Sequence, residues 1–278
     1  MTLLMNTAIK SAAAALALAL AACGAEPAPD AGTSELTATT TTLITGSETP
    51  EVMESYYSDF LSTYVSNTDG INFVAYGSVT PEDQAMLTAY INSLEARGPA
   101  NLSRDEEMAF WFNLYNAKTI EVILEAYPVS SIRKLGSFNS GPWDTKNMTV
   151  AGVGEMSLND IEHQTLRANW DEPRIHYAVN CASYGCPNLK PTPWTAETLE
   201  SDLTAAAEGY INHPRGFRVE DGRVTASKIF NWYKEDFGGS KDGILAHARL
   251  YAKGDLKTAL DAADTINGFE YNWNLNEN

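Results

Sequence analysis

Two cysteines and two histidines lie close together in the middle of the sequence. His163, His176, Cys181 and Cys186 fall within 24 positions. A cysteine becomes an effective nucleophile when a nearby imidazole or a helix N-terminus stabilises its thiolate. This cluster therefore indicates a site, and three kinds of site are compatible with it.

The first interpretation is a cysteine hydrolase or acyl transferase that acts on an amide or ester. Cys181 would be the nucleophile, and His163 or His176 would be its base. Glu162 or Asn116 would orient that base. Backbone N–H groups of the turn 181–187 would receive the developing oxyanion.

The other two interpretations give the cysteines no catalytic role. A Cys181–Cys186 disulfide would close a short loop, since four intervening residues allow the required approach of the two Cα atoms. The protein would then be a binding module. An aromatic surface would contact a partner or a peptidoglycan fragment, built from Trp111, Tyr184, Trp194 and Trp232. Alternatively, both cysteines and one or both histidines would bind zinc, although the spacing is not distinctive.

Residues 174–180 alternate and are predicted to form a strand that ends at the cysteine cluster. Alternation places His176 and Asn180 on one face and Cys181 on the opposite one. A His176–Cys181 pair therefore requires the strand to end near Asn180. If the strand continues, His163 is the better base for Cys181, or His176 serves Cys186.

The long helix predicted over 104–127 carries polar residues on its interior side. Asn116 falls among apolar residues, and Asn113 lies well toward the same side. A buried amide without partners costs roughly 1–3 kcal/mol. These amides therefore either bond loop backbone or, with Asn180 and Tyr184, bind substrate. The opposite, solvated face is predicted to carry Lys118, Glu121 and Glu125.

A second helix, predicted from Ser157 to about Ala168, places Glu162 on its apolar face. A carboxylate is almost never buried without a partner. Arg167, Arg174 or a histidine would supply one. His213 and His247, by contrast, are interpreted as solvated residues of helix ends or faces.

The remaining pattern predicts one helix-rich α+β domain with a small antiparallel or mixed sheet over residues 51–278. Capping residues predict helices beginning at Thr80 and Ser103. Asp221-Gly222 predicts a hairpin between 217–220 and 223–226. Other predicted elements are helices at 51–66, 195–211, 228–237 and 242–263, a strand at 72–76, a hairpin around 148–153 and a strand-like end.

Several segments together resemble one bacterial family, catalogued as domain of unknown function 547. They are AFWFNLYNAKTI (109–120), MSLNDIEHQTLR (156–167), RIHYAVNCASYGCPNL (174–189), SKIFNWYKEDF (227–237) and YNWNLN (271–276). The resemblance names no activity. It implies a fold distantly akin to papain- or transglutaminase-like enzymes, by analogy only.

The N-terminus predicts export and lipid anchoring. Residues 1–22 combine Lys10 with a short apolar run, as in a signal peptide. Leu20-Ala21-Ala22-Cys23 resembles a bacterial lipobox, which implies cleavage before Cys23 and acylation, with palmitate among the acyl groups. Gly24 in place of Asp then implies the outer membrane, facing the periplasm. Residues 23–50 are predicted to be a lipidated, disordered tether.

The amino-acid composition limits the classes of partner that the protein can bind. With 36 acidic and 19 basic residues, the net charge is −17, which disfavours nucleic acid. The expected partners are the membrane, through the lipid, and an unidentified small-molecule, peptide or cell-wall ligand. No cofactor or metal is predicted in the favoured interpretation.

Overall fold

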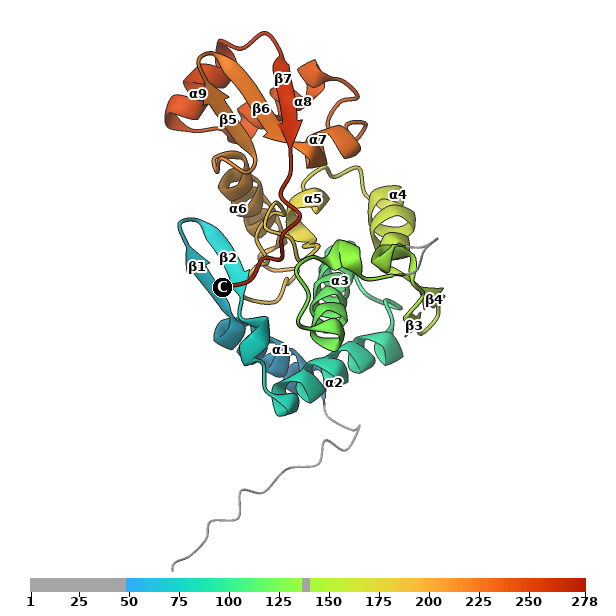
Figure 1. The fold of residues 1–278 in the computed structure, drawn as a ribbon. Coiled ribbons are helices and arrows are strands. Elements are labelled where there is room, and N and C mark those ends of the chain that lie inside the picture. Colours follow the sequence, from blue (N-terminus) through green and yellow to red (C-terminus); the bar gives the residue numbers. More distant parts are fainter. Residues whose placement is uncertain (1–48, 137–140) are drawn as a thin grey trace, which may run out of the picture. The chain divides into compact units, whose positions relative to one another are not determined.

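The computed structural model describes residues 49–136 and 141–278 (Figure 1). The predicted signal peptide, Cys23 and nearly all of the predicted tether lie outside these residues. Within the described ranges, no helix is both long and apolar enough to cross a membrane.

The N-terminal part is a helical layer with one hairpin. The Thr80 hydroxyl accepts a hydrogen bond from the Asp83 amide, and Ser103 forms a capping box with Glu106, so both predicted helix starts are confirmed. The elements are α1 (Pro50–Tyr64), β1 (Val65–Thr68), β2 (Ile71–Val74), α2 (Pro81–Arg97) and α3 (Arg104–Ala126).

Helix α3 is the central element, because side chains around most of its circumference are buried. The predicted solvated face is therefore wrong at Lys118 and Glu121, which are buried as an ion pair of 2.6 Å. The Thr88 hydroxyl of α2 also donates to Glu121 at 2.6 Å. The packing of α2 over α3 removes these charges from water, which helical periodicity alone cannot foresee. Glu125 is exposed, as predicted.

The middle of the chain contains short elements. Residues 160–166 form a π-helical segment, a rare geometry that often accompanies functional sites. The elements are β3 (Met148–Val150), β4 (Gly154–Met156), η4 (Asp160–Leu166), α4 (Arg167–Asn169), α5 (Ile175–Ala178) and α6 (Leu199–Ile211). Short 3₁₀ turns occupy Tyr76–Ser78, Ile132–Lys134 and Pro142–Asp144.

The C-terminal part is a mixed three-stranded sheet in the order β5-β6-β7, flanked by helices (Figure 1). The predicted hairpin at Asp221-Gly222 is confirmed, since β5 and β6 pair antiparallel. Strand β7 adds parallel to β6. The elements are β5 (Phe217–Glu220), β6 (Arg223–Ser227), α7 (Lys228–Trp232), α8 (Lys241–Tyr251), α9 (Gly254–Asp261) and β7 (Ile266–Glu270).

One predicted element has the wrong type. Residues 174–180 are not a strand, because Ile175–Ala178 form the helical turn α5. The Glu172 carboxylate accepts from the Arg174 amide and guanidinium, which fixes the chain at the start of this turn. Burial of the whole turn outweighs the β-preference of Ile175 and Val179.

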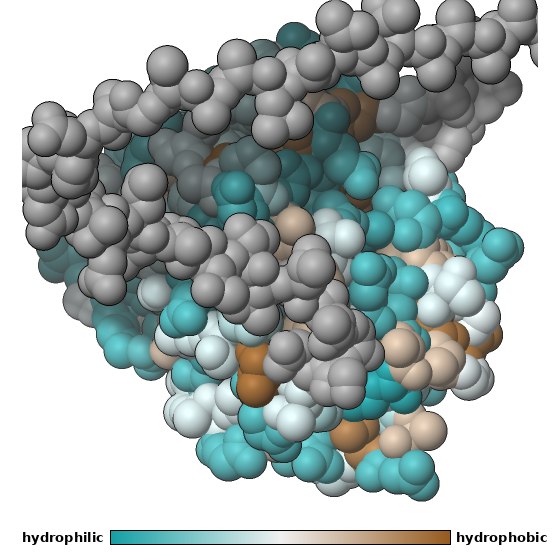
Figure 2. Space-filling view, turned by 90° about the horizontal axis from the view of Figure 1, so that it is seen from below, coloured by the Kyte–Doolittle hydropathy of each residue, from teal (hydrophilic) through white to brown (hydrophobic). Residues whose placement is uncertain are grey.

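The fold is α+β, as predicted: helices dominate, and the described sheets have two or three strands. The apolar core has two adjoining parts, one around α3 and one beneath the C-terminal sheet. Where the view from below shows described residues, their surface is mostly hydrophilic with scattered hydrophobic residues (Figure 2).

His247 is buried against the C-terminal core, contrary to the solvated interpretation. It is 8% exposed, and its Nε2 lies 2.8 Å from the Tyr177 hydroxyl. Burial lowers the pKa of this imidazole from 6.5 to about 4. Its neutral form is therefore the form that the folded state accommodates.

We expect His247 to make stability depend on pH in one window. A lowered folded-state pKa stabilises the protein above pH 6.5, and this contribution falls between about pH 6.5 and 4 as the unfolded chain binds a proton. The loss should reach about 3 kcal/mol at pH 4. Urea unfolding of wild type and His247→Gln across pH 7 to 4 measures it. Parallel curves for the two proteins would contradict the assignment.

Candidate functional site

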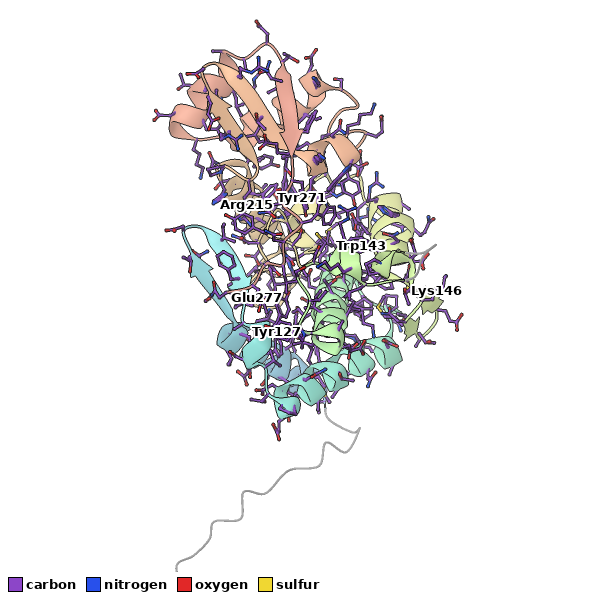
Figure 3. The ribbon with its side chains drawn as sticks, in the orientation of Figure 1. Tyr127, Trp143, Lys146, Arg215, Tyr271 and Glu277 are labelled. Atoms are coloured by element: carbon purple, nitrogen blue, oxygen red, sulfur yellow. The ribbon has the colours of Figure 1, made fainter. Side chains whose placement is uncertain are left out.

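A cavity of about 240 Å³ holds most of the predicted chemistry. Trp143 and Tyr271, which line it, lie in the region between the C-terminal sheet and α3 (Figure 3). The wall combines acid, imidazole and thiol groups with many rings. It is formed by Tyr115, Trp143, Asn159, Glu162, His176, Val179, Cys181, Cys186, Pro187, Ile229, Trp232, Tyr233, Tyr271 and Trp273.

The two cysteines touch at one side of this cavity. Their Sγ atoms are 2.7 Å apart, and both are present as thiols. Cys186 is buried and its sulfur accepts the Cys181 amide at 3.0 Å, whereas Cys181 is half-buried. The Cys181 sulfur also lies 3.1 Å from the hydroxyls of both Ser183 and Tyr271.

These surroundings make the thiols unequal. The hydrogen bond with Cys186, supported by Ser183 and Tyr271, lowers the pKa of Cys181 although burial opposes it. Burial raises the pKa of Cys186 well above its ordinary value, and its contact with Cys181 adds to this. Both cysteines line the cavity, and Cys181 is the more exposed of the two and the one that ionises first.

Asn116 of α3 fixes the backbone just before Cys181. Its Nδ2 donates to the Ala178 carbonyl at 2.9 Å, and its Oδ1 accepts the Asn180 amide at 2.8 Å. The Asn180 side chain continues the pattern by accepting from the Ala182 amide and donating to the Pro187 carbonyl. Ala182 adopts φ 56°, a left-handed conformation that these bonds help to hold.

The C-terminal tail closes over the same loop. The Tyr184 amide donates to the Asn274 carbonyl at 2.7 Å, and the Gly185 amide donates to the Asn272 carbonyl at 2.8 Å. A Cβ on Gly185 would lie 2.9 Å from backbone atoms of Asn272, so only glycine permits this approach. The tail thereby places the Tyr271 hydroxyl on Cys181.

His176 lies between two carboxylates. Its Nε2 is 2.6 Å from Asp236, and its Nδ1 is 3.8 Å from Glu162. Tyr233 stacks on the imidazole at 4.1 Å. Hydrogen bonds from His176 and Arg167 hold the pKa of the Asp236 carboxyl below its ordinary range, although burial opposes this.

The burial predicted for Glu162 is confirmed, since it is 5% exposed. Its partners are the Tyr115 hydroxyl, which donates at 3.2 Å, the Tyr233 hydroxyl and His176. The two arginines considered as its partners bond elsewhere. Arg167 forms a pair with Asp236, and Arg174 forms pairs with Glu172 and Glu200.

The structure thus brings Glu162, His176, Cys181 and Cys186 to one cavity and leaves other predicted residues outside it. His163 is not among the described lining residues, and its Nδ1 lies 3.0 Å from an Arg167 nitrogen. No hydrogen bond between Cys181 and a histidine is found within the described ranges. His176 shares the cavity with Cys181 but does not bond to it.

The asparagines predicted to bind substrate bond to backbone instead. Asn113 donates to the Trp194 carbonyl and accepts the Trp194 amide, both at 2.8 Å. Asn113, Asn116 and Asn180 are not among the described residues lining the cavity. Tyr184 lines a separate depression together with Arg215. A role in substrate binding stays a prediction for all four.

The predicted aromatic surface is wrong for two of its four members. Trp111 and Trp194 are 1% and 3% exposed, because both pack in the core around α3. Trp232 is exposed at the cavity instead, beside Trp273 and Tyr271. The zinc interpretation gains no support, since the described residues contain no group of three or more His, Cys, Asp or Glu suited to a metal ion.

Sequence reasoning did not identify Asp236, Ser183 and Tyr271 as site residues. A signal was present: Asp236 belongs to the segment SKIFNWYKEDF, and Tyr271 begins YNWNLN. Both segments carry the family resemblance. Spacing could not assign partners to these two residues, because Asp236 lies 60 positions from His176 and Tyr271 lies 90 positions from Cys181.

Residues 99–211 match the model of a family described as "Protein of unknown function, DUF547". This span includes α3, Glu162, His176 and both cysteines of the cavity, and it supports the family that the motifs indicated. No curated protein and no solved structure matches the chain significantly. The relation to papain- or transglutaminase-like enzymes stays a prediction.

We expect Asn116→Ala to lower the free energy of unfolding by about 2–3 kcal/mol. The change leaves the buried Ala178 carbonyl and Asn180 amide without this partner. Glu125→Ala on the exposed side of the same helix is the control and should change stability by less than about 0.5 kcal/mol. Denaturant unfolding compares the two. Equal and small losses of unfolding free energy in the two variants would contradict a structural role for the Asn116 hydrogen bonds.

Proposed function

We propose that this protein is an envelope lipoprotein whose described domain is a cysteine-dependent hydrolase or acyl transferase acting on an amide or ester. Cys181 is the nucleophile. The observation that carries the proposal is the placing of a half-buried thiol of lowered pKa in one cavity with Glu162 and His176. Perturbed nucleophiles beside acid–base groups in a concave pocket are typical of active sites.

The chemistry follows from the positions of these groups. The Cys181 thiolate attacks the carbonyl carbon, and the resulting tetrahedral intermediate expels an amine or alcohol that takes up a proton. The Glu162–His176 pair supplies this proton. Water or an amine then attacks the thioester and returns a proton to the Glu162–His176 pair. This step releases the acid or the transferred acyl product and restores the Cys181 thiolate.

Positioning groups support this assignment. Asp236 bonds to Nε2 of His176 and to Arg167, and Arg167 also contacts His163. These contacts fix the orientation of the His176 imidazole. The hydroxyls of Ser183 and Tyr271 each lie 3.1 Å from the Cys181 sulfur and 2.6 Å from each other, so the three groups form one hydrogen-bonded cluster. These residues act through Cys181 and His176.

A second candidate function rests on the 2.7 Å contact of the two sulfurs. Loss of two electrons and two protons to an oxidant would join them as a disulfide. Cys181 would then be unable to attack a carbonyl, and the domain would be a stapled binding module. The contact between the two sulfurs is compatible with both the hydrolase and the binding module. Measurements of thiol reactivity are therefore needed to distinguish the two functions.

We expect reduced wild type to alkylate at Cys181 with a midpoint below pH 8.5, the ordinary thiol pKa. In Cys186→Ala the midpoint should rise, because the largest cause of the lowered pKa is removed. Iodoacetamide rates from pH 5 to 9, read by intact-protein mass, measure both. Cys181→Ala is the control for labelling of Cys186. An ordinary thiol profile in wild type would contradict a nucleophilic Cys181.

The same samples decide between the two functions. The hydrolase requires reduced protein to form an acyl adduct of the expected mass with an activated ester such as p-nitrophenyl acetate, and Cys181→Ser to form none. His176→Ala should slow turnover of the adduct with little change in the alkylation midpoint, because His176 does not bond to the thiol. A protein that stays disulfide-bonded under mild reductant and forms no adduct would favour the binding module.

The proposal of an outer-membrane lipoprotein rests on LAAC after the apolar run and on Gly24. Acylation of Cys23 would anchor the chain stably, since each buried CH₂ contributes about 0.8 kcal/mol. The domain would then act in the periplasm on cell-wall peptide or another ligand within reach of the tether.

We expect Cys23→Ala to abolish incorporation of an alkyne-labelled fatty acid and to move the protein out of the membrane fraction. Cys181→Ala should retain both properties, which separates lipidation from reactivity of the cavity thiol. Gel fluorescence and fractionation of cells expressing each variant give the result. Acyl labelling that persists in Cys23→Ala would overturn the anchor.

A further inference from the structure

A chain of aromatic rings forms one wall of the cavity. Trp273 is central: its ring centroid lies 5.8 Å from Trp143, 4.6 Å from Tyr271 and 5.4 Å from Trp232. The rings are tilted against one another by 35–59° and therefore present both faces and edges. Trp232 is 44% exposed, so its ring is accessible from solvent.

The charge of this cavity is one-sided. None of the described residues that line it is Lys or Arg, and Glu162 is the carboxylate among them. Arg167, the nearest guanidinium along the chain, is bonded to Asp236 at 2.5 and 2.8 Å. It is therefore already paired with Asp236.

This composition discriminates between ligand classes. An anion would meet Glu162 with no Lys or Arg among the described lining residues to offset it. A polyhydroxylated sugar ring would leave hydroxyls unpaired against a wall that is mostly carbon, at roughly 1–3 kcal/mol for each buried group. A neutral apolar group would displace water from Glu162 and offer the carboxylate no polar contact in exchange. A cation meets both requirements, because ring faces and a carboxylate attract it.

We propose that the cavity binds an organic ammonium group, primary or quaternary, against Trp143, Trp232, Tyr271 and Trp273 with Glu162 as its counter-charge. About 240 Å³ accommodates an alkylammonium head and a short linker. The net charge of −17 raises the local concentration of cations. The role of this group as part of the substrate or as the acyl acceptor rests on the proposed function, whereas its binding does not.

The test compares two ligands that differ in charge and hardly in shape, choline and its carbon isostere 3,3-dimethylbutan-1-ol. The protein is the full chain carrying Cys181→Ser, so that the proposed nucleophile does not contribute. Tryptophan fluorescence and calorimetry measure binding, and the anion 3,3-dimethylbutyrate is titrated in the same way. We expect choline to bind at least tenfold more tightly than its isostere, and the anion to give no saturable binding.

Two variants locate the site. Trp232→Ala should weaken choline about fivefold, as expected for the loss of one cation–π contact. Leu250→Ala, which removes another exposed apolar side chain outside the cavity, should leave the affinity unchanged. Glu162→Gln should weaken choline at least tenfold and reduce the preference over the isostere. Trp232 lies at the surface, so its variant remains informative if Glu162→Gln fails to fold.

Each outcome has a defined meaning. Equal or tighter binding of the isostere, saturable binding of the anion, or an unchanged choline affinity in Trp232→Ala would overturn the proposal. These results are independent of the alkylation of Cys181 and of the acyl adduct. The ammonium site can therefore fail while the hydrolase stands, and a choline site without thiol reactivity would leave a binding module.

Discussion

The side-chain amide of Asn116 connects the core to the reactive loop. It donates to the Ala178 carbonyl and accepts from the Asn180 amide, and so bonds the backbone directly before Cys181. An amide buried to 99% is stable only when such bonds are made, so the interaction is required by the fold as well as by the site. The centrally packed α3 thereby determines where the cysteine loop begins.

The rest of the cavity depends on this fixed point and on the chain's last residues. The tail pairs with Tyr184 and Gly185, and continues to β2, where the Val74 amide donates to the Asn276 carbonyl (Figure 1). Tyr271, at the start of this tail, can reach Cys181 only because both segments are held. The acid–base groups belong to other elements: Glu162 lies in the π-helical segment, and Asp236 lies in the turn after α7. Residues distant in sequence therefore share one thiol environment.

Local signals predicted those parts of the structure that local physics determines. The capping box at Ser103, the turn at Asp221-Gly222 and the burial of Asn116 and Glu162 are examples. The helical turn at Ile175–Ala178 was missed because tertiary burial outweighed strand propensity. The buried Lys118–Glu121 pair was missed because only the packing of α2 shows that this face is covered. Asp236 and Tyr271 were missed for a different reason: a contact across 60 or 90 positions leaves no periodic trace in a single sequence.

The central claim is that the loop around Cys181 is held rigidly by α3 and the C-terminal tail. Native-state hydrogen exchange of three amides tests it most directly: Asn180, which donates to Asn116, and Tyr184 and Gly185, which donate to the tail. We predict that all three exchange only through global unfolding, at the free energy measured by denaturant. Exchange of these amides at rates near those of an unprotected peptide, while α3 stays protected, would contradict the account.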